Sequence, residues 1–172
     1  ASQGDGKIFY SIAANTTPRT RDYIASTNTF NAAATTVAGA TALQSVNKAS
    51  PTQDEYVAGY VNSAGTLQIM CFNGTTWTNE WSVSVGGTGT TRRFDIAYEK
   101  TSGDVMVAYS TNTATTNEMA YRTKSGASAC GTANWSAATN IDALRTAGIV
   151  QWVRLEASPA ASSNNIAIAW AD

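Results

Sequence analysis

Apolar and polar residues alternate along much of this chain, and the clearest example is the stretch from Arg92 to Ser110, RRFDIAYEKTSGDVMVAYS. Two alternating runs are joined by Thr101-Ser102-Gly103-Asp104, residue types that favour tight turns. Alternation with a period of two residues is typical of β-strands. The stretch therefore predicts a β-hairpin.

The same pattern occurs twice more. One copy begins at Leu43, with the sequence LQSVNKASPTQDEYVAGYVNSAG, and another begins at Val150, with VQWVRLEASPAASSNNIAIAWAD. Each copy has an aromatic residue near the end of its second run, namely Tyr60, Tyr109 and Trp170, at separations of 49 and 61 residues. The hairpin is therefore one copy of a repeat with a period of about 50 to 60 residues.

Further strands follow two of the hairpins. After Tyr60 the chain continues as GTLQIMCFNGTTW, and after Tyr109 as TNEMAYRTKSGASACGTANW. Each segment predicts a third strand, a turn with Gly and a fourth strand opened by Trp. The N-terminal sequences GKIFYSI and PRTRDYIASTNTF fit strands two to four of the same unit. The chain thus predicts a single all-β repeat domain over residues 1–172, with a partial unit at 8–35, complete units at 40–85 and 92–140, and a partial unit at 150–172.

Four-stranded antiparallel units at this period are typical of β-propeller blades, so the sequence predicts about three blades' worth of propeller-type repeats. Strands of such blades are covered on both faces, which fits the apolar runs VMVAY, IAIAW and IFYSI. The alternative is a β-sandwich, which needs no repeat and would alternate more regularly between apolar and polar residues.

Closed propellers contain about four to eight blades, so about three blades would leave unpaired strand edges at both ends. Three arrangements would resolve this: a fragment of a longer protein, a ring closed by several copies, or an open filament of copies. The chain starts at Ala1 without Met, and no signal peptide is visible, so we expect a processed or truncated product. The sequence leaves the three arrangements open.

Composition narrows the classes of function. The net charge is −1, and 13% of residues are charged against about 25% in an average soluble domain. Without a cluster of Lys and Arg we expect no nucleic-acid partner and no polybasic membrane anchor, and no apolar run is long enough for membrane insertion. A surface rich in Thr, Ser and Asn instead favours an extracellular or cell-surface protein.

The chain contains no histidine, which removes His-dependent catalysis and His-ligated metals. Two cysteines are too few for a cysteine-only zinc site, and we expect neither a metal nor another cofactor. Cys71 and Cys130 either pair as a disulfide in an oxidising compartment or remain two small apolar side chains in a core. The sequence leaves both states open.

The hairpin RRFDIAYEKTSGDVMVAYS and the turn FNGTTW resemble the repeats of large extracellular bacterial β-propeller proteins. Those repeats contain an Arg-x-Phe-Asp-Val-Ala-Tyr-Glu hairpin followed by a Trp-Asp-Gly-x-x-Trp turn. The N-terminal GDGKIFYS with TPRTR resembles their opening blade, which starts without its first strand. The resemblance covers most of the chain and implies a propeller, a secreted or surface-exposed setting and no established enzyme activity.

The sequence CFNGTTW also resembles, more weakly, the Cys-Trp-Asp-Gly-x-x-Trp turn of small fucose-binding propeller lectins, which assemble rings from two-blade chains. Phe72 stands where those lectins have Trp, and Asn73 stands where they have Asp. The Arg, Glu and Trp residues that hold the sugar in those lectins have no clean match in this chain. Carbohydrate binding is therefore a hypothesis for this chain.

Four residues at matching repeat positions are candidate ligand-binding residues. Trp77 and Trp135 follow Gly-containing turns, and they either offer platforms for sugar rings or anchor the outer strand of each unit. Arg21 and Arg122 lie on third strands, where an Arg either binds an acidic sugar or bridges neighbouring units to a carboxylate such as Asp95.

Two further features bear on catalysis and on the surface. Asp95 and Glu99 share one face of a strand at a separation of about 13 Å, which is too far for the carboxylate pair of a glycosidase. The adjacent Arg92 and Arg93 are expected at a solvated strand edge. We therefore expect no enzyme activity, and a glycosidase or lyase of propeller fold is the least favoured reading.

The sequence predicts an extracellular or cell-surface module for binding or adhesion, whose partner is a glycan or another surface ligand. The alternative is a structural subunit that self-associates into a surface oligomer or filament through exposed blade edges. Glycan binding would favour the first function, and concentration-dependent assembly without glycan binding would favour the second.

Overall fold

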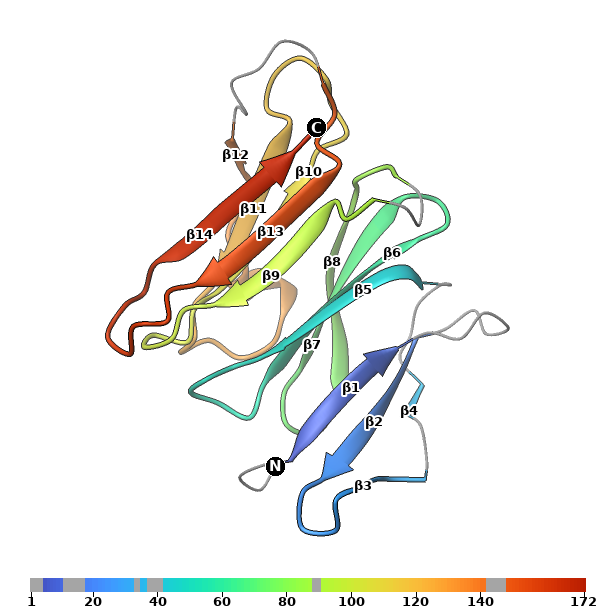
Figure 1. The fold of residues 1–172 in the computed structure, drawn as a ribbon, viewed down its shortest axis with the longest axis vertical. Coiled ribbons are helices and arrows are strands. Elements are labelled where there is room, and N and C mark those ends of the chain that lie inside the picture. The colour runs from blue at the N-terminus through green and yellow to red at the C-terminus, as the bar shows by residue number, and fades with distance from the viewer. Residues whose placement is uncertain (1–4, 11–17, 33–34, 37–41, 88–90, 142–147) are drawn as a thin grey trace.

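The computed structural model describes residues 5–10, 18–32, 35–36, 42–87, 91–141 and 148–172. Within these residues the protein is all-β, as predicted, with one 3-10 turn at Thr132–Asn134 and no α-helix. Four antiparallel sheets follow one another along the chain (Figure 1). No helix in the described part is long and apolar enough to cross a membrane.

Each sheet is built from strands that are consecutive in the chain. The first sheet contains β1 (Gly6–Tyr10), β2 (Arg19–Ile24), β3 (Thr29–Phe30) and β4 (Thr35–Thr36). The second contains β5 (Ala42–Ala49), β6 (Tyr56–Asn62), β7 (Thr66–Phe72) and β8 (Trp77–Ser84). The third contains β9 (Phe94–Tyr98), β10 (Val105–Ser110), β11 (Met119–Lys124) and β12 (Thr139–Ile141). The fourth is the hairpin of β13 (Trp152–Ala157) and β14 (Ile166–Ala171). Parts of the predicted first and second units, at 11–17, 33–34 and 40–41, lie outside the described residues.

The predicted hairpin between Arg92 and Ser110 forms β9 and β10, with Tyr98 opposite Val105. Its turn is closed by Glu99 N, which donates to Asp104 O at 2.7 Å, and by Gly103 N, which donates to Glu99 O at 3.2 Å. Gly103 has a φ of 72°, in the left-handed region that glycine adopts without a Cβ clash. The turn chemistry of the sequence therefore accounts for this local structure.

The four sheets pack face to face, and each interface has its own hydrophobic cluster. The cluster between the second and third sheets includes Val57, Leu67, Ile69, Phe94, Ile96 and Val107. The cluster between the third sheet and the β13–β14 hairpin includes Ala108, Met119, Val153 and Leu155. The cluster between the first and second sheets includes Phe9, Ala58, Tyr60 and Met70. The second and third sheets are therefore each packed against another sheet on both faces. Within the described residues, the first and fourth sheets are each packed against another sheet on one face only.

Gly59 in β6 allows the second and third sheets to approach closely. A Cβ atom at this position would lie 2.6 Å from the ring of Phe94 and 2.9 Å from Cδ1 of Ile69. Both separations are shorter than van der Waals contact, so a larger residue would force the sheets apart. The ring of Phe94, which is fully buried, fills the space that the glycine leaves.

The first strands of the second, third and fourth sheets, β5, β9 and β13, lie next to one another (Figure 1). Arg92, at the entry to β9, forms a parallel bridge with Trp152 of β13. Arg92 N donates to Gln151 O at 2.9 Å, and Arg92 O accepts from Val153 N at 2.8 Å. The described sheets form no closed ring, and face-to-face packing also fits a β-sandwich, so the propeller remains a prediction.

Candidate functional site

A groove of about 470 Å³ lies along the first strands of three sheets, and we name it the first-strand groove. Its lining residues are Gln44, Ser45, Val46, Asn47, Lys48, Thr91, Arg92, Phe94 and Trp152. Most of these side chains are polar, and none of them is a carboxylate. A groove that combines many hydrogen-bonding groups with one aromatic surface suits a polar ligand that also has an apolar face.

Trp152 supplies the aromatic surface of the groove. Its side chain is 54% exposed, the largest exposed fraction among the large hydrophobic residues that the structure describes. Alternation along β13 turns Val153 and Leu155 toward the core and leaves Trp152 in solvent. An exposed indole offers an apolar face on which the C–H surface of a ring can stack, and its N–H offers a donor.

Arg92 is held beside Trp152 by its backbone bonds and by Asp95. Arg92 Nη2 donates to Asp95 Oδ1 at 2.9 Å, and the Asp95 side chain is 2% exposed. Asp95 also accepts from the backbone N–H groups of Ile96 and Leu155, each at 2.9 Å. Asp95 is thus engaged in structural bonds, while the guanidinium of Arg92 makes a single hydrogen bond within the described part of the chain. Arg92 therefore keeps donors for a ligand in the groove.

The expectation that Arg92 and Arg93 both lie at a solvated strand edge is wrong for Arg93, which is buried. Arg93 is 6% exposed, and it donates to Val85 O at 2.8 Å, to Asn112 Oδ1 at 2.7 Å and twice to Gln151 Oε1. Burial lowers the pKa of the Arg93 guanidinium. Arg93 connects the third sheet to its neighbours on both sides, because Val85 follows β8 and Gln151 precedes β13.

A buried polar cluster lies between the second and third sheets. Lys124 Nζ donates to Glu55 Oε2 at 2.9 Å, and these side chains are 0% and 5% exposed. Tyr98 Oη donates to Glu55 Oε1 at 2.9 Å, and Lys124 Nζ also donates to Ser128 O at 3.0 Å. Burial raises the pKa of Tyr98, and the charge and hydrogen bond of Glu55 raise it further. Every charge in the cluster has an opposite partner, as buried charges require.

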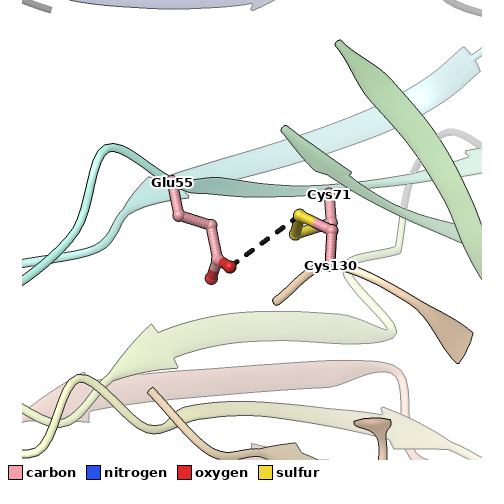
Figure 2. Close-up of side chains that lie close together, drawn as sticks. All are labelled: Glu55, Cys71 and Cys130. Carbon is pink, nitrogen blue, oxygen red and sulfur yellow. Dashed lines mark hydrogen bonds between the residues drawn. A yellow bond between two sulfur atoms is a disulfide. The ribbon is translucent and has the colours of Figure 1, made fainter. Parts of the chain in front are cut away.

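Cys71 of β7 and Cys130 form a disulfide beside this cluster, with their Cα atoms 5.6 Å apart (Figure 2). Of the two states that the sequence left open, the structure has the disulfide. Cys130 Sγ lies 3.8 Å from Glu55 Oε2, and this is a contact because a disulfide sulfur carries no proton. Glu55, Cys71 and Cys130 are close enough to hold a metal ion, but joined sulfurs supply no thiolate ligands. The arrangement ties the second sheet to the third.

Trp135 and Arg122 meet at the ring of Trp81. Trp135 is 7% exposed, its ring packs edge-on against Trp81 at 5.6 Å, and its Nε1 donates to Glu80 Oε2 at 3.0 Å. The guanidinium of Arg122 lies over the ring of Trp81, at 4.9 Å from its centroid. The structure thus places Trp135 in the core between the second and third sheets, with no exposed ring face for a ligand.

Trp77 and Arg21, the other two candidate residues, lie on the second and first sheets, away from Trp135 and Arg122. Trp77 is half-buried at the start of β8 and packs against Phe9 and Phe72, at centroid distances of 5.9 and 5.4 Å. Arg21 pairs with Ile8 across β1 and β2 and is half-buried. None of the four candidate residues from the sequence lines the first-strand groove, and the sequence analysis did not identify Trp152.

The chain matches no known protein family, and no curated protein matches it.

Proposed function

We propose that this chain is an extracellular or cell-surface module for binding or adhesion, without enzyme activity, that binds carbohydrate in the first-strand groove. The observation that carries the proposal is the exposed indole of Trp152 beside Arg92 in a groove with polar walls. A saccharide needs an apolar surface for the C–H face of its rings and hydrogen-bonding groups for its hydroxyls. Asn47, Ser45 and Arg92 supply groups of the second kind.

The proposal includes a propeller-type arrangement of the four sheets. The second and third sheets are meanders of four consecutive strands, neighbouring sheets pack face to face, and the first strands β5, β9 and β13 are adjacent. These features are expected of blades arranged around a central channel. In that arrangement the first-strand groove would form part of the channel wall.

The extracellular setting is supported by the disulfide and by the surface composition. Disulfides such as Cys71–Cys130 persist mainly in oxidising compartments. Only 13% of residues are charged, and hydroxyl and amide side chains take their place. Both features are compatible with a secreted or surface-exposed protein.

The test is binding to a glycan array followed by two matched substitutions. Trp152→Ala should weaken binding to the glycans bound by the unmodified protein about tenfold or more, because the stacking surface is lost. Trp170→Ala is the control, since Trp170 is 44% exposed on the same hairpin but does not line the groove. Equal losses for both variants, or full binding by Trp152→Ala, would contradict the proposed site. Circular dichroism of each variant checks that it has folded.

A second function, a structural subunit that self-associates, is favoured by one observation. All the exposed large hydrophobic residues that the structure describes lie on the first and fourth sheets, namely Ile8, Ile24, Phe30, Trp152 and Trp170. These two sheets are also the ones that described residues cover on one face. A mass that rises with concentration in light scattering, without glycan binding, would favour assembly over carbohydrate binding.

A further inference from the structure

A second pocket lies along the same strands as the first-strand groove. This pocket, of about 320 Å³, is formed by the far ends of β5, β9 and β13 and by the segments that follow them. Lys48 lines both spaces, so we treat them as one trough and name it the first-strand trough. From Gln44 to Ala49 it follows β5 for about 17 Å, at about 3.3 Å per residue. That length would accommodate several linked sugar rings.

The first-strand trough is cationic, although the whole chain has a net charge of −1. Lys48, Arg92 and Lys100 line it, and Glu156 is the only carboxylate among the residues that line it. Glu156 Oε2 already pairs with Arg154 Nη2 at 3.3 Å. The trough therefore attracts anions more strongly than the overall charge suggests.

The three cations keep hydrogen-bond donors for a ligand. Lys48 is exposed, and its ammonium makes no hydrogen bond or ion pair within the described part of the chain. Arg92 makes a single side-chain hydrogen bond, to Asp95. Lys100 Nζ donates to Pro159 O at 2.8 Å, which uses one of the three donors of an ammonium group.

We infer that the first-strand trough binds an extended acidic saccharide, whose carboxylates pair with Lys48, Arg92 and Lys100 while one ring stacks on Trp152. The inference rests on the proposed function, because it names the class of saccharide that the groove takes. Hydrogen bonds between cationic donors and carboxylates are roughly twice as strong as neutral ones. A neutral chain would use the indole but would leave the ammonium groups of Lys48 and Lys100 without an anionic partner within the described part of the chain, so charge determines the class.

The experiment compares two polymers with the same backbone, polygalacturonate and its methyl ester, together with polyglutamate as an acidic polymer without sugar. At low salt, polygalacturonate should bind at least about tenfold more tightly than the ester, and added salt should reduce the difference. Lys48→Gln with Lys100→Gln should weaken binding of the acidic polymer about tenfold and leave ester binding unchanged. Arg21→Gln is the control, because it removes one positive charge from β2, outside both pockets.

Equal affinity for the ester would overturn the inference, and so would equal affinity for polyglutamate, which would indicate general binding of polyanions. A loss in Arg21→Gln equal to that of the double variant would also overturn it. Binding of neutral glycans alone on the array would refute the acidic saccharide and leave the proposed function standing. An array without any bound glycan would refute both.

Discussion

The hairpins β9–β10 and β13–β14 share one sequence pattern but differ in burial. Every residue of β9 is buried, whereas in β13 only Val153 and Leu155 are. Tyr109 and Trp170 occupy matching positions in the repeat, yet they are 2% and 44% exposed. The first hairpin lies between two sheets, and described residues cover the second on one face. Burial in this protein is therefore set by the place of a sheet in the stack more than by the hairpin sequence.

The two hairpins also differ in how they are held. The third sheet is joined to the second by a large apolar cluster and by the Lys124–Glu55 ion pair, and the Cys71–Cys130 disulfide links β7 to the loop after β11. The β13–β14 hairpin is joined to the third sheet by a smaller cluster, by the backbone of Arg92 and by a hydrogen bond from Leu155 N to Asp95. Most of the folding stability should therefore lie between the two middle sheets.

The largest effect is expected from breaking the buried ion pair. Lys124→Met leaves the Glu55 carboxylate buried without its cation, and should reduce the free energy of unfolding by about 3–5 kcal/mol. Arg154→Met on β13 is the matched control, because its ion pair with Glu156 is 66% exposed on both sides. That substitution should cost less than about 1 kcal/mol. Urea unfolding followed by tryptophan fluorescence measures both, and similar costs would contradict the comparison.

Substitutions at two isoleucines compare the apolar packing of the third sheet with that of the β13–β14 hairpin. Ile96→Ala in β9 removes a fully buried side chain between two sheets, and should cost about 2–5 kcal/mol. Ile168→Ala in β14 removes a half-buried side chain, and should cost about 1 kcal/mol. Urea unfolding of the two variants gives the difference directly. Equal costs would show that the β13–β14 hairpin is as tightly packed as the third sheet.

The sequence predicted strands and turns correctly where the local pattern of residues determines them. The alternation and the Thr101–Asp104 turn predict β9 and β10, and the strands after β6 and after β10 pair in the expected order. Trp77 opens β8 as predicted, but the prediction that Trp135 opens the fourth strand of the next unit is wrong, because β12 begins at Thr139. The expectation that IAIAW is covered on both faces does not hold for β14, where the alanines and Trp170 are exposed. That difference depends on a neighbouring sheet, which the pattern of a single hairpin does not contain.

The candidate site was harder to predict, because its residues meet only through contacts between sheets. Arg92 and Arg93 are adjacent, yet one lines the groove and the other is buried against Gln151, 58 positions away. A signal for Trp152 was present in VQWVRLE, where alternation places the indole on the same face as Arg154 and Glu156. An aromatic residue on the polar face of a strand is a better candidate for ligand binding than one that follows a Gly-containing turn, such as the buried Trp135.

The smallest of the three predicted effects is the pH dependence that Tyr98 gives to the third sheet. Burial, followed by the charge and hydrogen bond of Glu55, raises its pKa above the ordinary value of 10.0, so the folded protein retains a phenolic proton that the unfolded chain releases. The stabilisation is fully present below about pH 10 and decreases by up to about 1.4 kcal/mol per pH unit above it.

Urea unfolding at about pH 9.5 and at about pH 11 gives the free energy of unfolding lost between the two pH values. This loss should be smaller for Tyr98→Phe than for the unmodified protein, by up to about 1.4 kcal/mol per pH unit. Tyr98→Phe also removes the hydrogen bond to Glu55, so it should be less stable at neutral pH by about 1–3 kcal/mol. Equal pH dependence would mean that Tyr98 ionises as readily in the folded state as in the unfolded chain, which its burial opposes. Burial also raises the pKa of Tyr56, but Tyr56 is present in both proteins, so the difference between their alkaline losses reports on Tyr98 at the interface of the middle sheets.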